Sequence, residues 1–306
     1  MDNQTTEYML VLTGLSDNPS LQLPLFQLFF LIYLMTLTVN LLILLLIITD
    51  SHLHSSMYFL LGTLACLDMG YSSVTVPRML YDLLTSKRII SLQACITQIF
   101  FFVFLAISEM CLLSVMSYDR YIAICRPLHY MRIMNWKACI QFVLIVLVFS
   151  AMYSLMHTLA LTKLSFYKSD SLQTFFCDLP QLLQVSSSDA FINEMLIFVL
   201  GTLLAVVISF ATFYPYITII ITVLKMATIN MRSKAFSTLF SHLTVVVIFY
   251  STLFFNYYSP DAKYHVIEDK VTSVFYTVLI PLLNPLIYSL RNQELKTSLR
   301  RALHRL

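Results

Sequence analysis

The sequence contains little charge for its length. Only 11% of its 306 residues are Asp, Glu, Lys or Arg, whereas 58% are hydrophobic. A soluble chain of this size carries about 25% charged residues, most of them on its surface. Much of the surface must therefore face lipid, which excludes a soluble globular protein. The net charge of +3 is too small to indicate a partner by itself.

Glycine is scarce and enzyme motifs are absent. The chain has four glycines and no GxGxxG, Walker, HExxH or GxSxG pattern, the arrangements that place a phosphate, a metal ion or a nucleophile. The six cysteines are scattered and lack the close pairs of a zinc site. Basic residues do not gather into a face for nucleic acid. We therefore expect no enzymatic activity and no nucleic-acid partner.

Long apolar runs dominate the chain instead. A transmembrane helix needs about 20 apolar residues, and seven runs reach that length, at residues 24–48, 57–80, 95–118, 138–162, 195–224, 235–258 and 271–290. A membrane β-barrel would show strands of about ten alternating residues, so it is excluded. The sequence predicts an all-α membrane protein, a seven-transmembrane helix bundle.

The basic residues predict the orientation of this bundle. Seven spans place the two termini on opposite sides. With the N-terminus outside, the inner segments hold twelve Lys and Arg residues and the outer loops hold six. The positive-inside rule favours that orientation. We expect a multi-pass protein of the plasma membrane, and Asn3, in an Asn-Gln-Thr sequon, is a candidate for glycosylation.

The chain therefore divides into three parts. We expect an extracellular N-terminus over residues 1–23, the transmembrane domain over residues 24–290, and a cytoplasmic segment over residues 291–306. This last segment is amphipathic, with leucines every four residues and basic residues opposite: Leu295, Leu299 and Leu303 against Lys296, Arg300 and Arg301. It predicts a short C-terminal helix along the inner leaflet, the alternative being a frayed basic tail.

Two acidic residues, Asp68 and Glu109, lie in the middle of apolar runs. Each costs about 2.5–3.5 kcal/mol at the bilayer centre, so both should face the bundle interior. Two neighbouring carboxylates favour a bound sodium ion or a shared proton. The alternative is that Asn40, Ser114 and Asn284 simply hydrogen-bond to them.

Two further features lie at the ends of apolar runs. Asn284-Pro285 interrupts the last run and predicts a kink that exposes carbonyl groups. Asp119-Arg120 ends the third run. It is consistent with a solvated ion pair of little energetic effect, or with an arginine that exchanges one partner for another.

Aromatic residues crowd the outer halves of the third and sixth runs. Packing or lipid contact explains most of them. The outer part of the third run has no Asp or Glu to pair an amine, so a cavity there would suit small, mostly apolar ligands. A small transporter or channel using Asp68 and Glu109 remains an alternative, although the repeat symmetry typical of transporters is not visible.

Five stretches in this order resemble the olfactory (odorant) receptors of the rhodopsin-like G-protein-coupled class: LHSSMYFL (53–60), VPRML (76–80), SYDRYIAICRPLHY (117–130), KAFSTLFSHLTVV (234–246) and PLLNPLIYSLRN (281–292). The resemblance extends over almost the whole chain. It implies a receptor that binds small hydrophobic volatile ligands and activates a stimulatory heterotrimeric G protein, which raises cyclic AMP. A non-signalling or poorly expressed relic of the family is the alternative.

The resemblance also implies roles for individual residues. Asp119, Arg120 and Tyr121 match the motif that holds the inactive state and engages the G protein. Tyr250, Asn284, Pro285 and Tyr288 match the switch residues. Asp68 and Glu109 match the sodium-site positions, and Cys95 and Cys177 match a disulfide. The ligand cavity would lie near Phe102, Val103, Ala106, Ile107, Leu200, Leu204, Tyr250, Leu253 and Thr277.

The chain departs from the family pattern in the loop that carries Cys177. Tyr167 and Ser187 stand where the family has a second pair of cysteines. We therefore expect one constraint fewer in this loop. Thr174 replaces a histidine of the family, which argues against metal binding there.

Overall fold

The computed structural model describes residues 8–16, 18–85, 88–166, 171–225, 240, 243–251, 266–291 and 293–303. Within these ranges, six helical segments are long and apolar enough to cross a membrane: α1 (Pro19–Thr49), α2 (Ser56–Leu84), α3 (Leu92–Cys125), α5 (Trp136–Leu161), α7 (Phe191–Leu224) and the segment Lys270–Ile287. Each coincides with a predicted run. The predicted run at 235–258 falls largely outside the described residues, and its residues 243–251 are helical.

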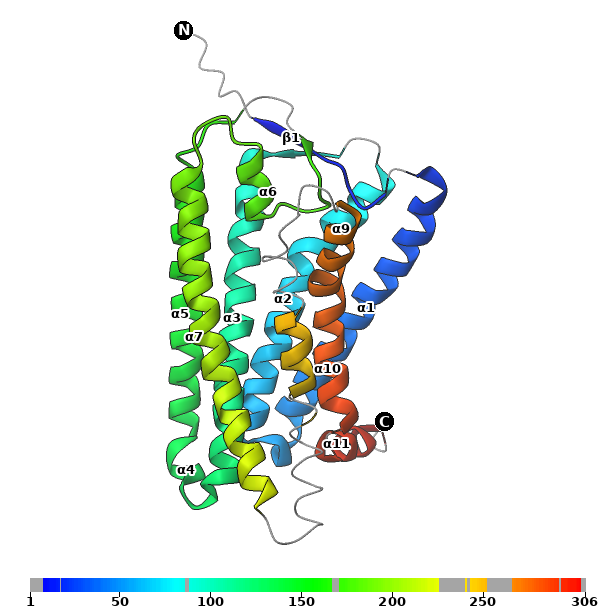
Figure 1. The fold of residues 1–306 in the computed structure, drawn as a ribbon. Coiled ribbons are helices and arrows are strands. Elements are labelled where there is room, and N and C mark those ends of the chain that lie inside the picture. Colours follow the sequence, from blue (N-terminus) through cyan, green and yellow to red (C-terminus); the bar gives the residue numbers. More distant parts are fainter. Residues whose placement is uncertain are drawn as a thin grey trace.

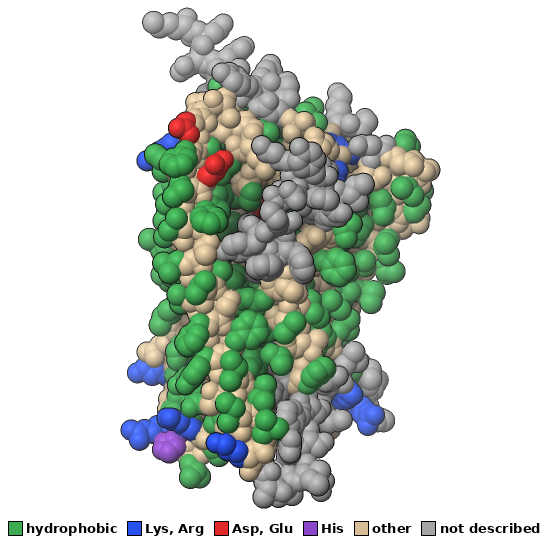
Figure 2. Space-filling view, in the orientation of Figure 1, with side chains coloured by type: hydrophobic (Ala, Val, Ile, Leu, Met, Phe, Trp, Pro, Cys, Tyr) green, Lys and Arg blue, Asp and Glu red, His purple; other side chains and the backbone are tan. Residues whose placement is uncertain are grey.

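The long helices lie side by side in one bundle (Figure 1). We call the end that carries the strand β1 the N-terminal end and the end that carries the helix α11 the C-terminal end. On the face shown in Figure 2, hydrophobic side chains cover the middle of the molecule, and Lys and Arg side chains lie near its two ends. Phe198, Val206 and Phe210 of α7 are each more than 60% exposed. Such a surface is stable only in lipid, so this is a multi-pass membrane protein.

Helix α1 begins at Pro19, five residues before the predicted run. The Asn18 side chain accepts a hydrogen bond from the Ser20 backbone N–H at 3.1 Å, and Pro19 occupies the first helical turn. Asparagine as N-cap followed by proline is a favourable helix start. The predicted run began at Pro24 because hydropathy detects apolar length and not capping.

A three-stranded sheet covers part of the N-terminal end and was not predicted. Strand β1 (Met9–Leu12) pairs antiparallel with β2 (Ile89–Ser91) and parallel with β3 (Ser171–Leu172). Leu10 and Leu12 are buried while Met9 and Val11 are exposed. Each strand is too short to be recognised alone, and each forms only because distant segments supply its hydrogen bonds.

Shorter elements complete the ends of the bundle. At the C-terminal end are η1 (Ser51–Leu53), η2 (Pro127–His129), α4 (Tyr130–Ile133) and α11 (Gln293–Leu303). The short helix α6 (Leu179–Gln184) lies near the N-terminal end (Figure 1). The last span consists of α9 (Val266–Val274), a π-helical turn at Phe275–Leu279, and α10 (Ile280–Arg291).

Helix α11 has the expected two faces. Leu295 is 2% exposed and Leu299 is half-buried, whereas Lys296 and Arg300 are exposed. Leu295 packs into the main core of the bundle. The C-terminal segment is therefore a helix with an apolar face against the bundle.

Candidate functional site

A buried polar group lies at the centre of the bundle. Asp68 of α2 and Glu109 of α3 are 1% and 0% exposed. The side-chain amide of Asn284, on α10, donates to Asp68 Oδ1 at 2.9 Å and to Glu109 Oε1 at 2.7 Å. One amide nitrogen thus holds both carboxyl groups. Of the three predicted hydrogen-bond partners, Asn284 takes this role, whereas Asn40 and Ser114 bond elsewhere.

Pro285 accounts for the bond that Asn40 makes. A proline inside a helix has no N–H to donate to the carbonyl four residues earlier, which here is that of Pro281. The Asn40 amide donates to the Pro281 carbonyl at 3.0 Å. The carbonyl that the kink exposes is therefore satisfied by α1, which ties α1 to α10 beside the two carboxyl groups.

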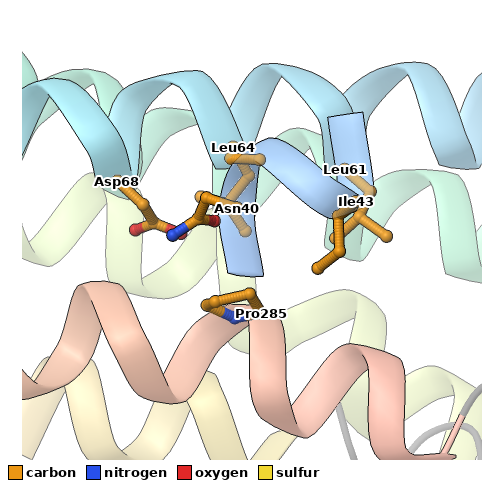
Figure 3. Close-up of a pocket in the computed structure, with 7 residues that line it drawn as sticks. Asn40, Ile43, Leu61, Leu64, Asp68 and Pro285 are labelled. Atoms are coloured by element: carbon orange, nitrogen blue, oxygen red, sulfur yellow. The ribbon is translucent and has the colours of Figure 1, made fainter. Parts of the chain in front are cut away.

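Buried oxygen atoms around these carboxyl groups are of the kind that bind a sodium ion. Glu109 Oε2 and Asn40 Oδ1 are buried and have no hydrogen-bond partner among the described residues, and oxygen ligands suit a hard cation. The adjoining pocket is lined by Asn40, Asp68 and Pro285 with apolar neighbours (Figure 3). The oxygen atoms present therefore suit a sodium ion as well as a proton shared by the two carboxyl groups.

Asp119 and Arg120 form a second polar group, at the C-terminal end of α3. Arg120 Nε donates to Asp119 Oδ2 at 3.0 Å, and a second guanidinium nitrogen contacts the same oxygen. Asp119 is 1% exposed and the Arg120 side chain 12% exposed. The Asp119–Arg120 pair is therefore not the solvated ion pair that was one alternative from the sequence. The pair is buried, and a buried pair holds its geometry more strictly than an exposed one.

Tyr130 is a third member of this group that sequence reasoning missed. Its hydroxyl donates to Asp119 Oδ1 at 2.9 Å. Burial and the nearby Asp119 carboxylate raise the pKa of the Tyr130 hydroxyl, so it stays a donor at neutral pH. The sequence contains no signal for this contact, because η2 turns the chain between the two residues. We call Asp119, Arg120 and Tyr130 the arginine lock.

Tyr250 belongs to a chain of hydroxyl groups that joins three helices. Its hydroxyl lies 3.0 Å from Thr212 Oγ1 of α7, which lies 2.6 Å from Ser114 Oγ of α3. Ser117 Oγ also donates to the Thr212 carbonyl at 2.7 Å. Tyr250 was expected among the switch residues, but the sequence had not indicated Thr212 as its partner. These bonds couple the positions of α3, α7 and residues 243–251.

One of the positions expected to line a ligand cavity, Phe102, lies in an aromatic cluster. The ring centroid of Phe102, on α3, lies 5.2 Å from those of Tyr71 and Phe176 and 5.9 Å from that of Tyr276. Phe176 adjoins Cys177, which is the signal by which it could have been found. Thr277 is fully buried in the π-helical turn.

Some of the remaining predicted site residues lie within the described part of the chain, and others lie outside it. Side chains of four of them are half-buried against the main core, namely Val103, Ala106, Ile107 and Leu204. Leu200 is half-buried as well. Leu253 and Asn3 lie outside the described residues, and the side chain of Tyr288 does too. Tyr121 is half-buried, with its ring centroid 6.3 Å from that of Tyr118.

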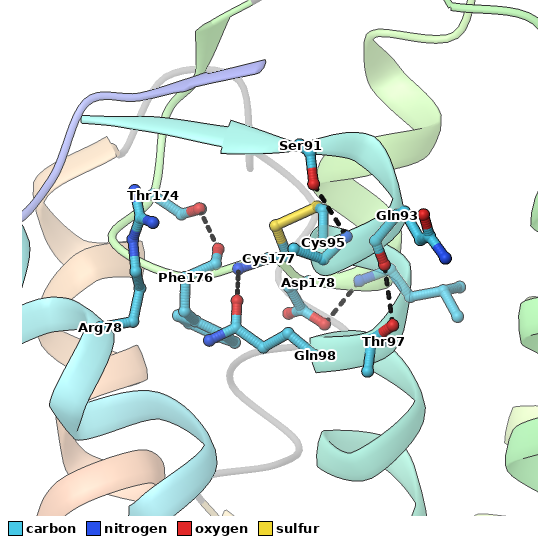
Figure 4. Close-up of a disulfide and its surroundings, with 12 residues drawn as sticks. Arg78, Ser91, Gln93, Cys95, Thr97, Gln98, Thr174, Phe176, Cys177 and Asp178 are labelled. Atoms are coloured by element: carbon cyan, nitrogen blue, oxygen red, sulfur yellow. Dashed lines mark hydrogen bonds between the residues drawn. A yellow bond between two sulfur atoms is a disulfide. The ribbon is translucent and has the colours of Figure 1, made fainter. Parts of the chain in front are cut away.

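A disulfide joins Cys95 of α3 to Cys177, the pairing that the resemblance implies (Figure 4). Both cysteines are fully buried. Gln98 supports the bridge, since its Oε1 accepts a hydrogen bond from the Cys177 backbone N–H at 2.9 Å while its amide donates to the Val74 carbonyl. The bridge places Phe176 against Phe102.

Serine side chains form hydrogen bonds within the same loop. Ser187 Oγ donates to the Ser165 carbonyl at 2.7 Å, and the Ser165 backbone N–H donates to Ser188 Oγ at 3.0 Å. Phe166 and Ser186 form a backbone bridge beside them. Hydrogen bonds of serine side chains and a backbone bridge therefore join residues 165–166 to residues 186–188, and the expectation of one constraint fewer stays a prediction.

Asp178, next to the disulfide, gives this loop a pH dependence. Its carboxylate is 5% exposed and accepts the Leu179 backbone N–H at 2.7 Å. Burial raises the pKa of Asp178 to about 6 from 3.8, although that hydrogen bond acts in the opposite direction. Because the pKa is raised on folding, the stabilisation is complete below pH 4 and is lost as the pH rises through 6. The difference corresponds to about 3 kcal/mol.

We therefore expect Asp178→Asn to abolish the change in loop stability between pH 4 and 7. Hydrogen exchange of residues 171–185 in the purified protein, measured at several pH values, checks this. Asp189→Asn is the matched control, since Asp189 lies in the same loop but is exposed. An unchanged pH profile in Asp178→Asn contradicts the assignment.

These features define a helical-bundle membrane protein: six apolar helices of membrane-spanning length among the described residues, a buried polar interior, and a buried Asp119–Arg120 pair at one end. The sequence matches the family model of olfactory receptors over residues 29–305. It is 44% identical over 301 residues to olfactory receptor-like protein COR4 of Gallus gallus, an alignment that covers 98% of this chain and 96% of that protein. Olfactory receptor 5B12 of Homo sapiens is 44% identical over 307 residues, with the same coverage.

The chain belongs to the olfactory receptor family, whose members are G-protein-coupled receptors and not enzymes.

Proposed function

We propose that this protein is an odorant receptor of the plasma membrane. It binds small hydrophobic volatile ligands within the helix bundle and activates a stimulatory heterotrimeric G protein, which raises cyclic AMP. The observation that carries the proposal is the arginine lock at the C-terminal end of α3, in a chain of this family. Asp119 accepts hydrogen bonds from both Arg120 and Tyr130.

In this proposal the structure corresponds to the inactive state. Arg120 is engaged by Asp119, and Asp119 is held in turn by Tyr130. Activation requires Arg120 to leave this partner, so a ligand acts by favouring a state in which the lock is open. The hydroxyl chain of Tyr250, Thr212 and Ser114 links α3 to the helices that would move.

The end of the bundle that carries Arg120 is assigned to the cytoplasm. The positive-inside count supports this orientation, which places the N-terminus outside the cell. At the same end, Leu128 is 95% exposed and Met131 80% exposed. Large apolar side chains with so little cover supply a contact surface for a protein partner, here the G protein.

The ligand would lie near the aromatic cluster around Phe102. The cluster contains rings from α2, α3, the last span and the disulfide-bonded loop. A ligand that displaces these rings would therefore change the packing of all four segments. Its lining is apolar, which suits volatile molecules with few polar groups. At the polar centre, we propose that Asp68 and Glu109 share a proton or bind a sodium ion, while the Asn284 amide donates to both carboxyl groups.

A cyclic AMP screen of the full-length receptor against a broad panel of volatile compounds tests the proposal. Cells with and without the stimulatory G protein are compared, and surface labelling confirms that the receptor reaches the membrane. A ligand response that requires the G protein is expected. A ligand-dependent current without any G protein would indicate a channel, and a receptor that is abundant at the surface yet silent would indicate a non-signalling relic.

Tyr130→Phe should raise the basal cyclic AMP level several-fold. The change removes the hydroxyl that holds Asp119, and a hydrogen bond to a charged group contributes about 1.5–3 kcal/mol. The lock would then open more often without ligand. Tyr118→Phe is the control, because Tyr118 lies on the exposed side of α3. Equal basal levels in the wild type and Tyr130→Phe would show that Tyr130 does not hold the lock.

A further inference from the structure

The connection between α1 and α2 contacts three other elements at the C-terminal end of the bundle. It contains η1 and the start of α2, and includes the SSMYF stretch at residues 55–59. The stretch supported the family resemblance, but no function was assigned to it. We call residues 50–59 the connecting segment.

The first contact joins the connecting segment to α11. The Tyr58 hydroxyl donates to Glu294 Oε2 at 2.6 Å. Tyr58 is 2% exposed, so its ring is packed inside the bundle while its hydroxyl reaches the first turn of α11. A short hydrogen bond to a carboxylate is among the stronger contacts available to a neutral donor.

The second contact joins the same two elements at the other end of α11. Arg301 Nη1 lies 3.2 Å from Asp50 Oδ2 and 3.0 Å from His52 Nδ1. Three neighbours of the Asp50 carboxyl lower its pKa: the Ser298 hydroxyl, His52 through its hydrogen bonds, and the Arg301 guanidinium. Asp50 therefore stays charged. Glu294 and Arg301 are two turns apart on α11, so the helix is held at two points.

The third contact joins the connecting segment to the chain that follows the arginine lock. Ser56 Oγ donates to the Met134 carbonyl, and the Phe59 ring lies edge-on to Trp136 at 5.3 Å. Met134 ends the α4 turn that begins with Tyr130. The connecting segment thus lies between α11 on one side and the stretch with the arginine lock on the other.

We propose that the connecting segment is a positioning element for G-protein coupling. Through Tyr58–Glu294 and Asp50–Arg301 it holds α11 in a fixed place beside the arginine lock, so that the two present one surface to the G protein. The proposal rests on the proposed function. Tyr58, Glu294, Asp50 and Arg301 act as positioning residues, and loss of their contacts lowers coupling without changing the affinity for ligand.

The test compares changes of single side chains in the full-length receptor. Tyr58→Phe and Glu294→Leu are expected to lower the maximal ligand-driven cyclic AMP, normalised to surface labelling, by at least about threefold, since each removes a charge-assisted bond. The ligand concentration at half-maximal response should stay within about twofold, because that bond lies far from the proposed cavity. Glu294→Gln keeps an oxygen that accepts from Tyr58 and should restore the response. Tyr81→Phe, on the exposed side of α2, is the control.

A charge exchange tests the second contact. Asp50→Arg should lower coupling, and adding Arg301→Asp to it should restore coupling. A reduced response that neither Glu294→Gln nor the exchanged pair restores would indicate a general loss of structure and would overturn the proposal.

Hydrogen exchange of α11 in the purified receptor separates this proposal from the proposed function. Faster exchange over Gln293–Leu303 in Tyr58→Phe supports the positioning role. Equal exchange in Tyr58→Phe and wild type overturns the proposal whatever the cyclic AMP result. A wild-type receptor that raises no cyclic AMP with any ligand overturns the proposed function alone, because the exchange measurement needs no G protein.

Discussion

Arg120→Ala is expected to abolish ligand-driven cyclic AMP while the receptor remains at the cell surface. In the structure Arg120 makes its described hydrogen bonds to Asp119, and a side chain held in this way is released only when α3 and its neighbours rearrange. If the released guanidinium engages the G protein, its loss removes the contact that the active state needs. The fold should tolerate the change, because Asp119 keeps its bond from Tyr130.

The measurement is cyclic AMP per labelled receptor over the full range of ligand concentration. Arg132→Ala is the matched control, since it removes the same charge from an exposed position near the same end. It should retain at least about half of the response, because an exposed charge contributes little. An undiminished response in Arg120→Ala would refute the role of the arginine lock.

Asn284→Leu is expected to destabilise the receptor by at least about 1.5–3 kcal/mol, the range for losing a hydrogen bond to a charged group. The Asn284 amide is the described donor to both Asp68 and Glu109. Without it, Asp68 Oδ1 and Glu109 Oε1 stay buried and lose the donor that they have in the structure. We expect a lower temperature of unfolding in nanodiscs and a smaller fraction of receptor at the surface.

Two further variants make the interpretation specific. Asn193→Leu changes an asparagine whose amide nitrogen has no hydrogen-bond partner, so it should cost far less. A triple variant with leucine at Asp68, Glu109 and Asn284 should recover most of the lost stability, because replacing a whole buried polar group is often neutral. If Asn284→Leu and Asn193→Leu unfold at the same temperature, the amide does not hold the carboxyl groups together.

The burial of Asp68 and Glu109 could be predicted from sequence, but their shared partner could not. A charge in an apolar run must turn away from lipid, and that cost depends only on the run itself. Which of several amides reaches both carboxyl groups depends on how α2, α3 and α10 are rotated against one another. Asn40 and Asn284 look equivalent in the sequence. In the structure, one holds the carboxyl groups and the other caps the carbonyl exposed by Pro285.

Contacts between distant loops were the least predictable part. Tyr130 meets Asp119 because η2 reverses the chain, and Ser187 meets Ser165 because the loop with Cys177 folds back on itself. Neither contact has a periodic pattern, since hydroxyl groups bond to whatever oxygen is brought within reach. Strand β1 likewise exists only where β2 and β3 supply its partners.

The sequence by itself determined the class of protein and the family, and it predicts the number and orientation of the apolar runs. These follow from hydropathy, from charge and from motifs, which are local properties that each stretch carries wherever it lies. The tertiary structure decided which polar groups meet: the amide shared by two carboxyl groups, the tyrosine that completes the arginine lock, and the two points that hold α11. Hydrogen bonds depend on distances of a few tenths of an ångström, and only the packed helices set those distances.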